Sequence, residues 1–387
     1  MQTDMKAFID GRIGDFLSDL ETLVNIDSSS DNVEGIEAVA RTLMPRLEAM
    51  GFVTRLEKLG DRGVPCLLAF NGSQAERSDI MLLGHMDTVF PTGEAEKRPF
   101  RVEHRRALGP GVADMKGGLL VALHALESLH HEGLLKRIAV RVCFNGDEEV
   151  GSAGSREWIE YHARKSRRVF VFEPCRPGHR FVLQRKGGGG FLISARGVAA
   201  HAGVEPEKGA NAAVEIAHQV LKIQAFNQQT KKGVSANVTV VRGGKKTNII
   251  PDHAEARVDV RVDRKADLGV AEAFFRSLPH RTAVPGVSLT VSGGVDRPPM
   301  EADEPTMQLW QLFEESAAEL GLDIANISTG GCSDGNFTSA AGTPTIDGMG
   351  PIGANAHRDD EYVDIDSIVP QIQLITAVCQ SIAENNL

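Results

Sequence analysis

The chain has 387 residues, more than one ordinary domain holds, and its 42% hydrophobic and 24% charged residues are typical of a soluble globular protein. A formal net charge of −10 excludes the broad basic face of a nucleic-acid-binding protein, and no apolar run approaches the length of a membrane span. The first residues lack a signal-peptide core and the five cysteines show no paired spacing, so we expect a cytoplasmic protein with reduced thiols that binds neither nucleic acid nor membrane.

The first half of the chain alternates between helical and strand patterns. Apolar residues at helical spacing predict one helix over about 3–24 and a second from Asp31 to a stop at Gly51. Short apolar runs then alternate with helices, which predicts an α/β/α sandwich around a largely parallel sheet. The expected strands are 52–56, 66–70, 80–83, 138–144 and 169–172, and the helices are 117–131 and 152–165.

The pattern changes near residue 186. There Gly187–Gly190 precedes elements in the order strand–helix–strand–strand–helix–strand, which is typical of a ferredoxin-like α+β unit. Their expected positions are 191–195, 209–226, 234–242, 253–263, 266–277 and 287–292. The α/β pattern returns after about 298, with helices at 304–320 and 366–384. We therefore predict a large domain, 1–185 with 298–387, and an inserted small domain, 186–297. The glycine run is either a hinge or a glycine-rich strand.

Acidic and imidazole side chains lie just after the predicted strands of the large domain, where such sheets bind ligands. Carboxylates combined with imidazoles suit zinc-like divalent ions, and two such ions can activate one water for hydrolysis. The candidate residues are His85, Asp87, Asp114, Glu148, Glu149, Glu173 and His357.

Each candidate also has an ordinary structural interpretation. His85 alone is more often a satisfied buried histidine, Asp114 a helix N-cap, and Glu148–Glu149 a solvated turn. His357 lies in a polar stretch that resembles a surface loop. However, two adjacent glutamates point in different directions, so one can bind a metal while the other acts as a base. The occurrence of all these groups in one chain favours the metal site.

With these motifs, the whole chain resembles the aminoacylase/carboxypeptidase family of dinuclear zinc exopeptidases, and within it the bacterial glutamate (folate-hydrolysing) carboxypeptidases. Cys332 departs from the pattern, since such relatives tend to have threonine there. The resemblance implies a zinc-exopeptidase-like α/β/α catalytic domain with an inserted ferredoxin-like lid and dimerisation domain, and a homodimer through that domain. The matching stretches are Gly84–Val89, Leu108–Gly118, Asp147–Ser152, Gly154–Arg156, Ala200–Gly203, Asn248–Pro251, Asp259–Arg261, Gly330–Gly335 and His357.

The resemblance also implies a role for each position in the large domain. One ion is held by His85 and Glu173, the other by Glu149 and His357, and Asp114 bridges the two. Glu148 is the general base that moves a proton from water to the leaving nitrogen, and Asp87 orients the imidazole of the first ion. The family further implies a cis peptide bond after the bridging aspartate.

The small domain is implied to recognise the substrate. His201 stabilises the negative charge that develops on the carbonyl oxygen, although a histidine in this context is as often an ordinary loop residue. Arg261 and Asn248 bind the free carboxylate, and Lys186 adds charge for an acidic side chain. If the protein dimerises, His201 acts either in its own site or in that of the partner.

We therefore predict a zinc-dependent metallo-exopeptidase or amidohydrolase. It cleaves the amide bond next to a C-terminal amino acid with a free carboxylate, as a glutamate carboxypeptidase does, in a small-molecule substrate that is an N-acyl amino acid or a dipeptide with a glutamate-like terminal residue. The alternatives are an N-acyl-amino-acid deacylase of the acetylornithine or succinyl-diaminopimelate type, or a dipeptidase. A metal-free binding protein and a structural zinc protein are disfavoured, because the ligand set is intact and rich in carboxylates rather than cysteines.

Overall fold

The computed structural model describes residues 3–72, 77–230 and 233–385. They form two compact units with separate hydrophobic cores. The large unit comprises Met1–Gln184, Ala302–Ser328 and Ser333–Leu387, and the small unit comprises Arg185–Glu301 and Thr329–Cys332. The grouping of Thr329–Cys332 with the small unit was not anticipated, and the predicted domain boundaries stay a prediction.

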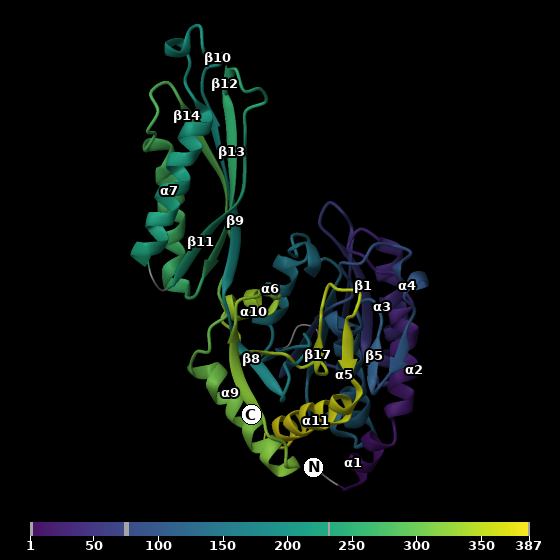
Figure 1. Ribbon diagram of the computed structural model, residues 1–387. Coiled ribbons are helices and arrows are strands. Elements are labelled where there is room, and N and C mark those ends of the chain that lie inside the picture. The colour runs from purple at the N-terminus through teal and green to yellow at the C-terminus, as the bar shows by residue number, and fades with distance from the viewer. Residues whose placement is uncertain (1–2, 73–76, 231–232, 386–387) are drawn as a thin grey trace. The chain divides into compact units, whose positions relative to one another are not determined.

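A mixed sheet forms the centre of the large unit (Figure 1). Its strands lie in the order β1-β2-β6-β3-β7-β16-β8-β15. The four central strands, from β6 to β16, are parallel, whereas β1, β2 and β8 run antiparallel to their neighbours. The parallel part is therefore the middle of the sheet. The bounds are β1 Val53–Leu59, β2 Val64–Phe70, β3 Ile80–His85, β6 Val140–Asn145, β7 Val169–Val171, β8 Arg180–Arg185, β15 Ala325–Thr329 and β16 Thr345–Asp347.

Helices cover both faces of this sheet, which gives the predicted α/β/α layers. Successive side chains of a strand point to opposite faces. On β3, Ile80 and Leu82 join a core with α1, α2, α3, α5, α9 and α11, while Met81 and Leu83 join a second core with α6 and α10. The helices are α1 Thr3–Asp10, α2 Ile13–Val24, α3 Val33–Ala49, α4 Glu94–Lys97, α5 Gly117–His131, α6 Arg156–Arg164, α9 Glu304–Leu320, α10 Gly335–Ala340 and α11 Ile368–Asn385.

The single helix expected over 3–24 is wrong, because the chain breaks at Gly11–Arg12 into α1 and α2. Both helices face the same core, so Ile9 and Phe16 are buried on either side of the break and the apolar spacing continues across it. The next helix, α3, begins at Val33, two residues after the expected Asp31. Its N-cap is Asn32, whose side chain accepts a hydrogen bond from the Gly35 N–H.

A small antiparallel sheet of the large unit was also missed. Its order is β17-β18-β5-β4, and its strands are only two or three residues long. Such short strands give almost no periodic signal in a sequence. Their bounds are β4 Arg101–Glu103, β5 Arg106–Leu108, β17 Gly353–Ala354 and β18 Tyr362–Asp364.

The small unit has the ferredoxin-like topology that the element order predicted. Its antiparallel sheet has the order β11-β13-β9-β14, and α7 and α8 pack on one face. Along β13, alternate residues are buried against these helices. A two-stranded ladder, β10 with β12, completes the unit. The bounds are β9 Gly187–Arg196, β10 Ala200–His201, α7 Ala212–Thr230, β11 Val234–Gly243, β12 Ile249–Ile250, β13 His253–Val262, α8 Leu268–Ser277 and β14 Ser288–Arg297.

The run Gly187–Gly190 forms the first part of β9 and pairs with β13 along its whole length. Strand β14 approaches it closely. A Cβ atom at Gly189 would lie only 2.1 Å from the carbonyl oxygen of Gly294, whereas one at Gly190 would have nothing nearer than 3.5 Å. The glycines thus include a position where two backbones require the absence of a side chain.

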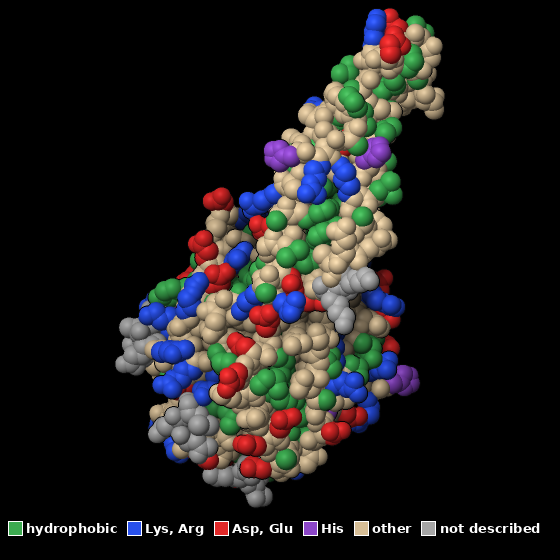
Figure 2. Space-filling view, turned by 90° about the vertical axis from the view of Figure 1, so that its left-hand side faces the viewer, with side chains coloured by type: hydrophobic (Ala, Val, Ile, Leu, Met, Phe, Trp, Pro, Cys, Tyr) green, Lys and Arg blue, Asp and Glu red, His purple; other side chains and the backbone are tan. Residues whose placement is uncertain are grey.

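The described surface mixes charges of both signs. On the face of the molecule drawn in Figure 2, acidic and basic side chains are interspersed over the large unit. No described helix combines the length and apolar character needed to cross a membrane.

The packing of β9 against β14 predicts opposite results for two neighbouring substitutions. Gly189→Ala should destabilise the protein by about 1–3 kcal/mol, because the new methyl group overlaps the backbone of β14. Gly190→Ala, on the same strand, is the matched control and should leave stability nearly unchanged. Equilibrium unfolding in urea checks both. Equal stability of the two variants would show that β9 and β14 do not approach as described.

Candidate metal centre

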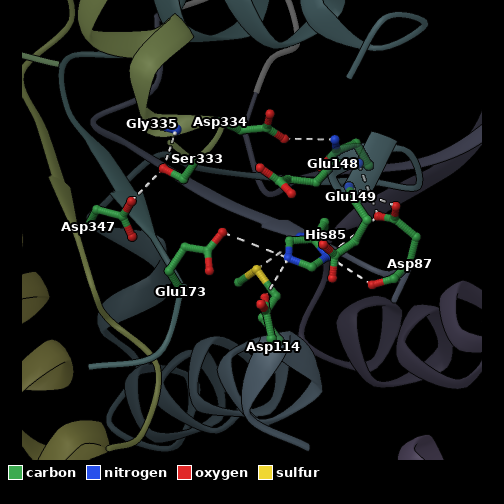
Figure 3. Close-up of polar contacts among 12 residues, drawn as sticks. His85, Asp87, Asp114, Glu148, Glu149, Glu173, Ser333, Asp334, Gly335 and Asp347 are labelled. Atoms are coloured by element: carbon green, nitrogen blue, oxygen red, sulfur yellow. Dashed lines mark hydrogen bonds and ion pairs between the residues drawn. The ribbon is translucent and has the colours of Figure 1, made fainter. Parts of the chain in front are cut away.

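Three parallel strands bring candidate ligands together at their carboxyl ends, on one side of the large sheet. His85 is the last residue of β3 and lies opposite Asn145, the last residue of β6. Glu148 and Glu149 follow β6 in a short helical turn, and Glu173 follows β7, which pairs with β3 on its other side. Because the carboxyl ends of parallel neighbours meet, these side chains converge (Figure 3).

Asp114 reaches the same place from an irregular helical turn, Val112–Lys116, that leads into α5. The Asp114–Met115 peptide bond is cis. The glycines that follow allow α5 to start very close to the end of β7. A Cβ atom at Gly118 would lie 1.9 Å from the carbonyl oxygen of Phe172, the residue before Glu173. The absence of a side chain at Gly118 therefore allows the turn that carries Asp114 to lie close to the end of β7.

The two carboxylate oxygens of Asp114 face two different imidazoles. Its Oδ1 lies 3.1 Å from His85 Nε2, and its Oδ2 lies 3.2 Å from His357 Nε2. Each imidazole has a second carboxylate beside it: Glu173 Oε1 is 3.8 Å from His85 Nε2, and Glu149 Oε2 is 3.2 Å from His357 Nε2. The result is two donor sets that share one aspartate.

The charges of this cluster are suited to cations. The side chains of Asp114, Glu149 and Glu173 are at most 13% exposed. Burial raises the pKa of Glu173 well above its usual range, and the charge of Asp114 adds to the effect. Burial also raises the pKa of Glu149, whose Oε1 is buried with no hydrogen-bond partner among the described residues. Several buried carboxylates without a compensating cation are unfavourable, so the residues fit a site for divalent ions.

The pKa values of the two histidines also indicate that the cluster favours positive charge. Hydrogen bonds with Asp114 and Glu149 raise the pKa of His357 to about 10. Burial opposes the protonation of His85, yet hydrogen bonds with Asp114 and Asp87 raise its pKa well above its usual value. Imidazole and carboxylate donors together are typical of zinc and similar ions.

Asp87 links the histidine to the glutamate turn. The Nδ1 atom of His85 lies 2.9 Å from the main-chain carbonyl oxygen of Asp87 and 3.4 Å from its carboxylate. The carboxylate accepts hydrogen bonds from the backbone N–H groups of Glu148 and Glu149, at 3.2 and 3.1 Å, and from the hydroxyl of Ser30. The main-chain oxygen is thus the nearer partner of the imidazole, and the carboxylate mainly holds the turn.

Comparison with known proteins agrees with this geometry. Residues 81–381 match the model of "Peptidase family M20/M25/M40". The chain is 35% identical over 360 residues to carboxypeptidase G2 of Pseudomonas sp. (strain RS-16), covering 90% of this chain and 85% of that protein. The chain belongs to peptidase family M20/M25/M40.

Other members and solved structures extend this result. A succinyl-diaminopimelate desuccinylase of Gluconacetobacter diazotrophicus is 29% identical over 320 residues, covering 77% of this chain and 80% of the relative. The Bacillus subtilis YXEP protein, a dinuclear metal-binding peptidase of family M20, has a TM-score of 0.68 at 16% identity, covering 97% and 99% of the two chains. As a family member, the protein is a metal-dependent peptidase or amidohydrolase.

The small unit carries the remaining predicted site residues, and it places them at two separate ends. His201 and Asn248 lie together, because His201 pairs with Ile249 and the Ala202 N–H donates to the Asn248 carbonyl oxygen at 3.0 Å. Both side chains belong to exposed residues. The His201 Nδ1 accepts a hydrogen bond from the Gly203 N–H at 3.2 Å.

Arg261 and Lys186 lie at the other end of the sheet. Arg261 pairs with Gly188 in the strand ladder, whereas His253, next to the β10–β12 ladder, pairs with Arg196. Eight residues of extended strand separate these two positions, or about 27 Å at the usual rise per residue. The guanidinium of Arg261 donates to both carboxylate oxygens of Asp259, at 3.0 and 2.9 Å. The ammonium of Lys186 lies 3.0 Å from Asp263.

Sequence reasoning missed the supporting acids of the site. Asp334 accepts hydrogen bonds from Ser152 and Asn145, beside the glutamate turn, and Glu361 is fully buried although its stretch reads as a surface loop. The signal that was available for Asp334 is its place in the Gly330–Gly335 motif. For Glu361, a run of acidic residues after His357 gave no indication that one of them turns inward.

The two donor sets predict which substitutions remove which ion. In chelated protein reloaded with zinc and desalted, we expect Glu173→Ala and His357→Ala each to retain one ion per chain, where the unaltered protein retains two. Glu148→Gln, a neighbour of the ligands but in neither set, should retain both. Elemental analysis gives the stoichiometry. Two ions in both ligand variants would contradict this assignment.

Proposed function

We propose that the enzyme hydrolyses the amide bond next to a C-terminal, glutamate-like amino acid with a free carboxylate. The observation that carries the proposal of a two-ion hydrolase is the pair of donor sets that share Asp114. The substrate class is supported by the likeness to carboxypeptidase G2, which is stronger and covers more of the chain than that to the desuccinylase.

Zinc is the proposed metal, because imidazole and carboxylate oxygen are among its usual ligands. His85 and Glu173 would hold one ion, His357 and Glu149 the other, and Asp114 would bind both through its two oxygens. Two bound ions supply Lewis acidity, which polarises the scissile carbonyl and lowers the pKa of a water. The buried carboxylates lie close together, as the binding of two neighbouring ions requires.

Glu148 is the proposed general base. It comes directly before the ligand Glu149 in the turn after β6, and Figure 3 draws its side chain near those of Glu149 and His85. Its backbone N–H is fixed by Asp87. Glu148 would take a proton from the attacking water as the new C–O bond forms. It would return the proton to the amide nitrogen as the C–N bond breaks.

Substrate recognition is proposed for the small unit. Arg261 would bind the free carboxylate, helped by Asn248, and Lys186 would favour an acidic side chain. Asp259 supports this role, because its bidentate contact fixes the plane of the Arg261 guanidinium before any ligand arrives. His201 would donate a hydrogen bond to the carbonyl oxygen of the scissile amide.

The distance between the two ends of the small unit supports a homodimer. Arg261 and His201 are separated by about the length of a strand, roughly 27 Å, which is too far for one small substrate to contact both in the same small unit. We therefore propose that the small unit mediates dimerisation and that His201 and Asn248 act in the partner's site. Exposed apolar side chains on α7, Val214 and Leu221, and the unpaired edge of β11 are candidate contacts.

The second candidate function is that of an N-acyl-amino-acid deacylase. It is favoured by the 29% identity to the succinyl-diaminopimelate desuccinylase. Such an enzyme would use the same metal ligands and Glu148, and would differ in the residues of the small unit. Substrate preference separates the two candidates.

A substrate panel tests the function. Zinc-loaded protein should release glutamate or aspartate from N-acyl amino acids and dipeptides, and chelated protein should not. Glu148→Gln should keep both ions but lose activity by orders of magnitude, since the base is removed. Liquid chromatography of the released amino acids gives the rates. Preferential release of ornithine or diaminopimelate would replace the carboxypeptidase assignment by the deacylase one, and near-normal turnover by Glu148→Gln would remove its role as base.

The proposed dimer predicts that two inactive variants restore each other. Glu148→Gln and His201→Ala should both be nearly inactive alone. After random exchange of subunits, roughly a quarter of the sites would combine an intact Glu148 with an intact His201 from the partner. Activity should return to about that level, while each variant carried through the same exchange alone stays inactive. No recovery in a mixture whose heterodimers are demonstrated by differently tagged chains would contradict the shared site.

A further inference from the structure

A buried carboxylate that takes no part in the proposed reaction joins two ligand-bearing segments of the large unit. Glu361 has no exposed surface. Within the part of the chain that the structure describes, no Lys, Arg or His forms an ion pair with it. The buried ammonium of Lys116 is near enough to interact with its charge but donates its hydrogen bond to the Ile26 carbonyl oxygen, so the hydrogen bonds of Glu361 must compensate for much of the cost of burying the carboxylate.

The partners of Glu361 are backbone N–H groups around Asp114. Its Oε1 accepts hydrogen bonds from the N–H groups of Ala113 and Asp114, at 2.8 and 3.0 Å, and its Oε2 accepts one from Gly111 at 3.2 Å. N–H groups close together in a turn form a concave site for an anion. Here the anion is a side chain of the same protein, and it fixes the peptide from which the Asp114 side chain extends.

Glu361 also lies in the segment that carries His357, which with Glu149 and Asp114 forms the second donor set. This segment turns tightly, with hydrogen bonds from Arg358 N–H to the Asn355 carbonyl oxygen and from Glu361 N–H to the Arg358 carbonyl oxygen. His357 itself is half exposed and has a positive φ of 67°. The segment then enters β18, which pairs with β5 just before the Asp114 turn.

We propose that Glu361 is a positioning residue that fixes Asp114 relative to His357 and thereby sets the affinity of the second metal ion. The inference rests on the metal roles proposed above. His357 Nε2 and Asp114 Oδ2 lie 3.2 Å apart on two segments that are distant in the sequence, and Glu361 is the side chain of one segment that binds the backbone of the other. Its loss would let that distance vary and so disturb two ligands of the second ion, whereas at the first ion only the shared Asp114 is affected, because His85 and Glu173 are built on β3 and β7.

A purely structural role makes a different prediction. If Glu361 only stabilised the fold, its substitution would lower the melting temperature of the metal-free protein but leave both metal affinities of the folded protein unchanged. A positioning role instead weakens the affinity for the second ion more than that for the first, whatever happens to the melting temperature.

The test compares Glu361→Gln with Asp359→Asn. The amide of the first variant keeps one acceptor oxygen but turns an NH₂ group toward N–H donors. The second removes the same charge from the same segment at a side chain that is 91% exposed. Zinc affinities of the chelated, folded proteins are measured by competition with a chromophoric chelator. In Glu361→Gln we expect the second ion to bind roughly 10- to 100-fold more weakly, as for other residues that orient ligands, and the first ion, which shares only Asp114, to be weakened less. Asp359→Asn should match the unaltered protein.

The outcomes are distinguishable. If the unaltered protein does not bind two ions, the proposed function fails. If it binds two and Glu361→Gln binds both with unchanged affinity, only the role of Glu361 is overturned. Should Glu361→Gln not fold without metal, Glu361→Asp replaces it. The shorter carboxylate cannot reach all three N–H groups and should also weaken the second ion, and unchanged affinities there overturn the inference as well.

Discussion

The fold of the large unit must overcome the repulsion among three buried carboxylates at the candidate metal centre. Asp114, Glu149 and Glu173 approach one another where water is largely excluded, and imidazoles are the nearest source of positive charge. The raised pKa values of Glu173 and His357 are two signs of the same imbalance, since one carboxylate resists ionisation while one imidazole retains its proton. Divalent ions relieve both at once. The fold must therefore hold these groups rigidly against their repulsion.

Rigid support comes from elements that differ in kind. His85 and Glu173 stand at the ends of adjacent parallel strands, whose ladders fix their separation. The position of Asp114 depends on the close approach of two backbones at Gly118, which has no side chain. It also depends on the hydrogen bonds that Glu361 accepts from backbone N–H groups. Glu149 depends on Asp87, which holds the backbone of its turn. The first kind of support comes from the sheet, the second from the start of α5 together with a loop carboxylate, and the third from a residue in the loop after β3.

This difference explains how much of the site could be predicted from the sequence. The strand ends and α5 follow from apolar periodicity. The positions of His85 and Glu173 and the start of α5 at Gly117 could therefore be predicted. The burial of Glu361 was not, because a loop of acidic residues has the same composition whether one of its carboxylates faces water or a set of N–H groups. The break at Gly11 was hidden for a related reason. Both helices bury residues against one core, and apolar spacing reports the face of a helix rather than its continuity.

In the proposed mechanism, the small unit recognises the substrate and the large unit holds the reacting groups. Its two groups of polar residues lie at opposite ends of one antiparallel sheet, and each is held by short-range contacts: His201 by its own turn and Arg261 by Asp259. The Nη1 atom of Arg261 is 3.5 Å from the sulfur of Cys332, the position that departs from the pattern of similar carboxypeptidases. If Arg261 binds the substrate carboxylate as proposed, Cys332 borders that contact. The departure then acts on substrate fit, and it leaves the donor sets, which lie wholly in the large unit, as they are.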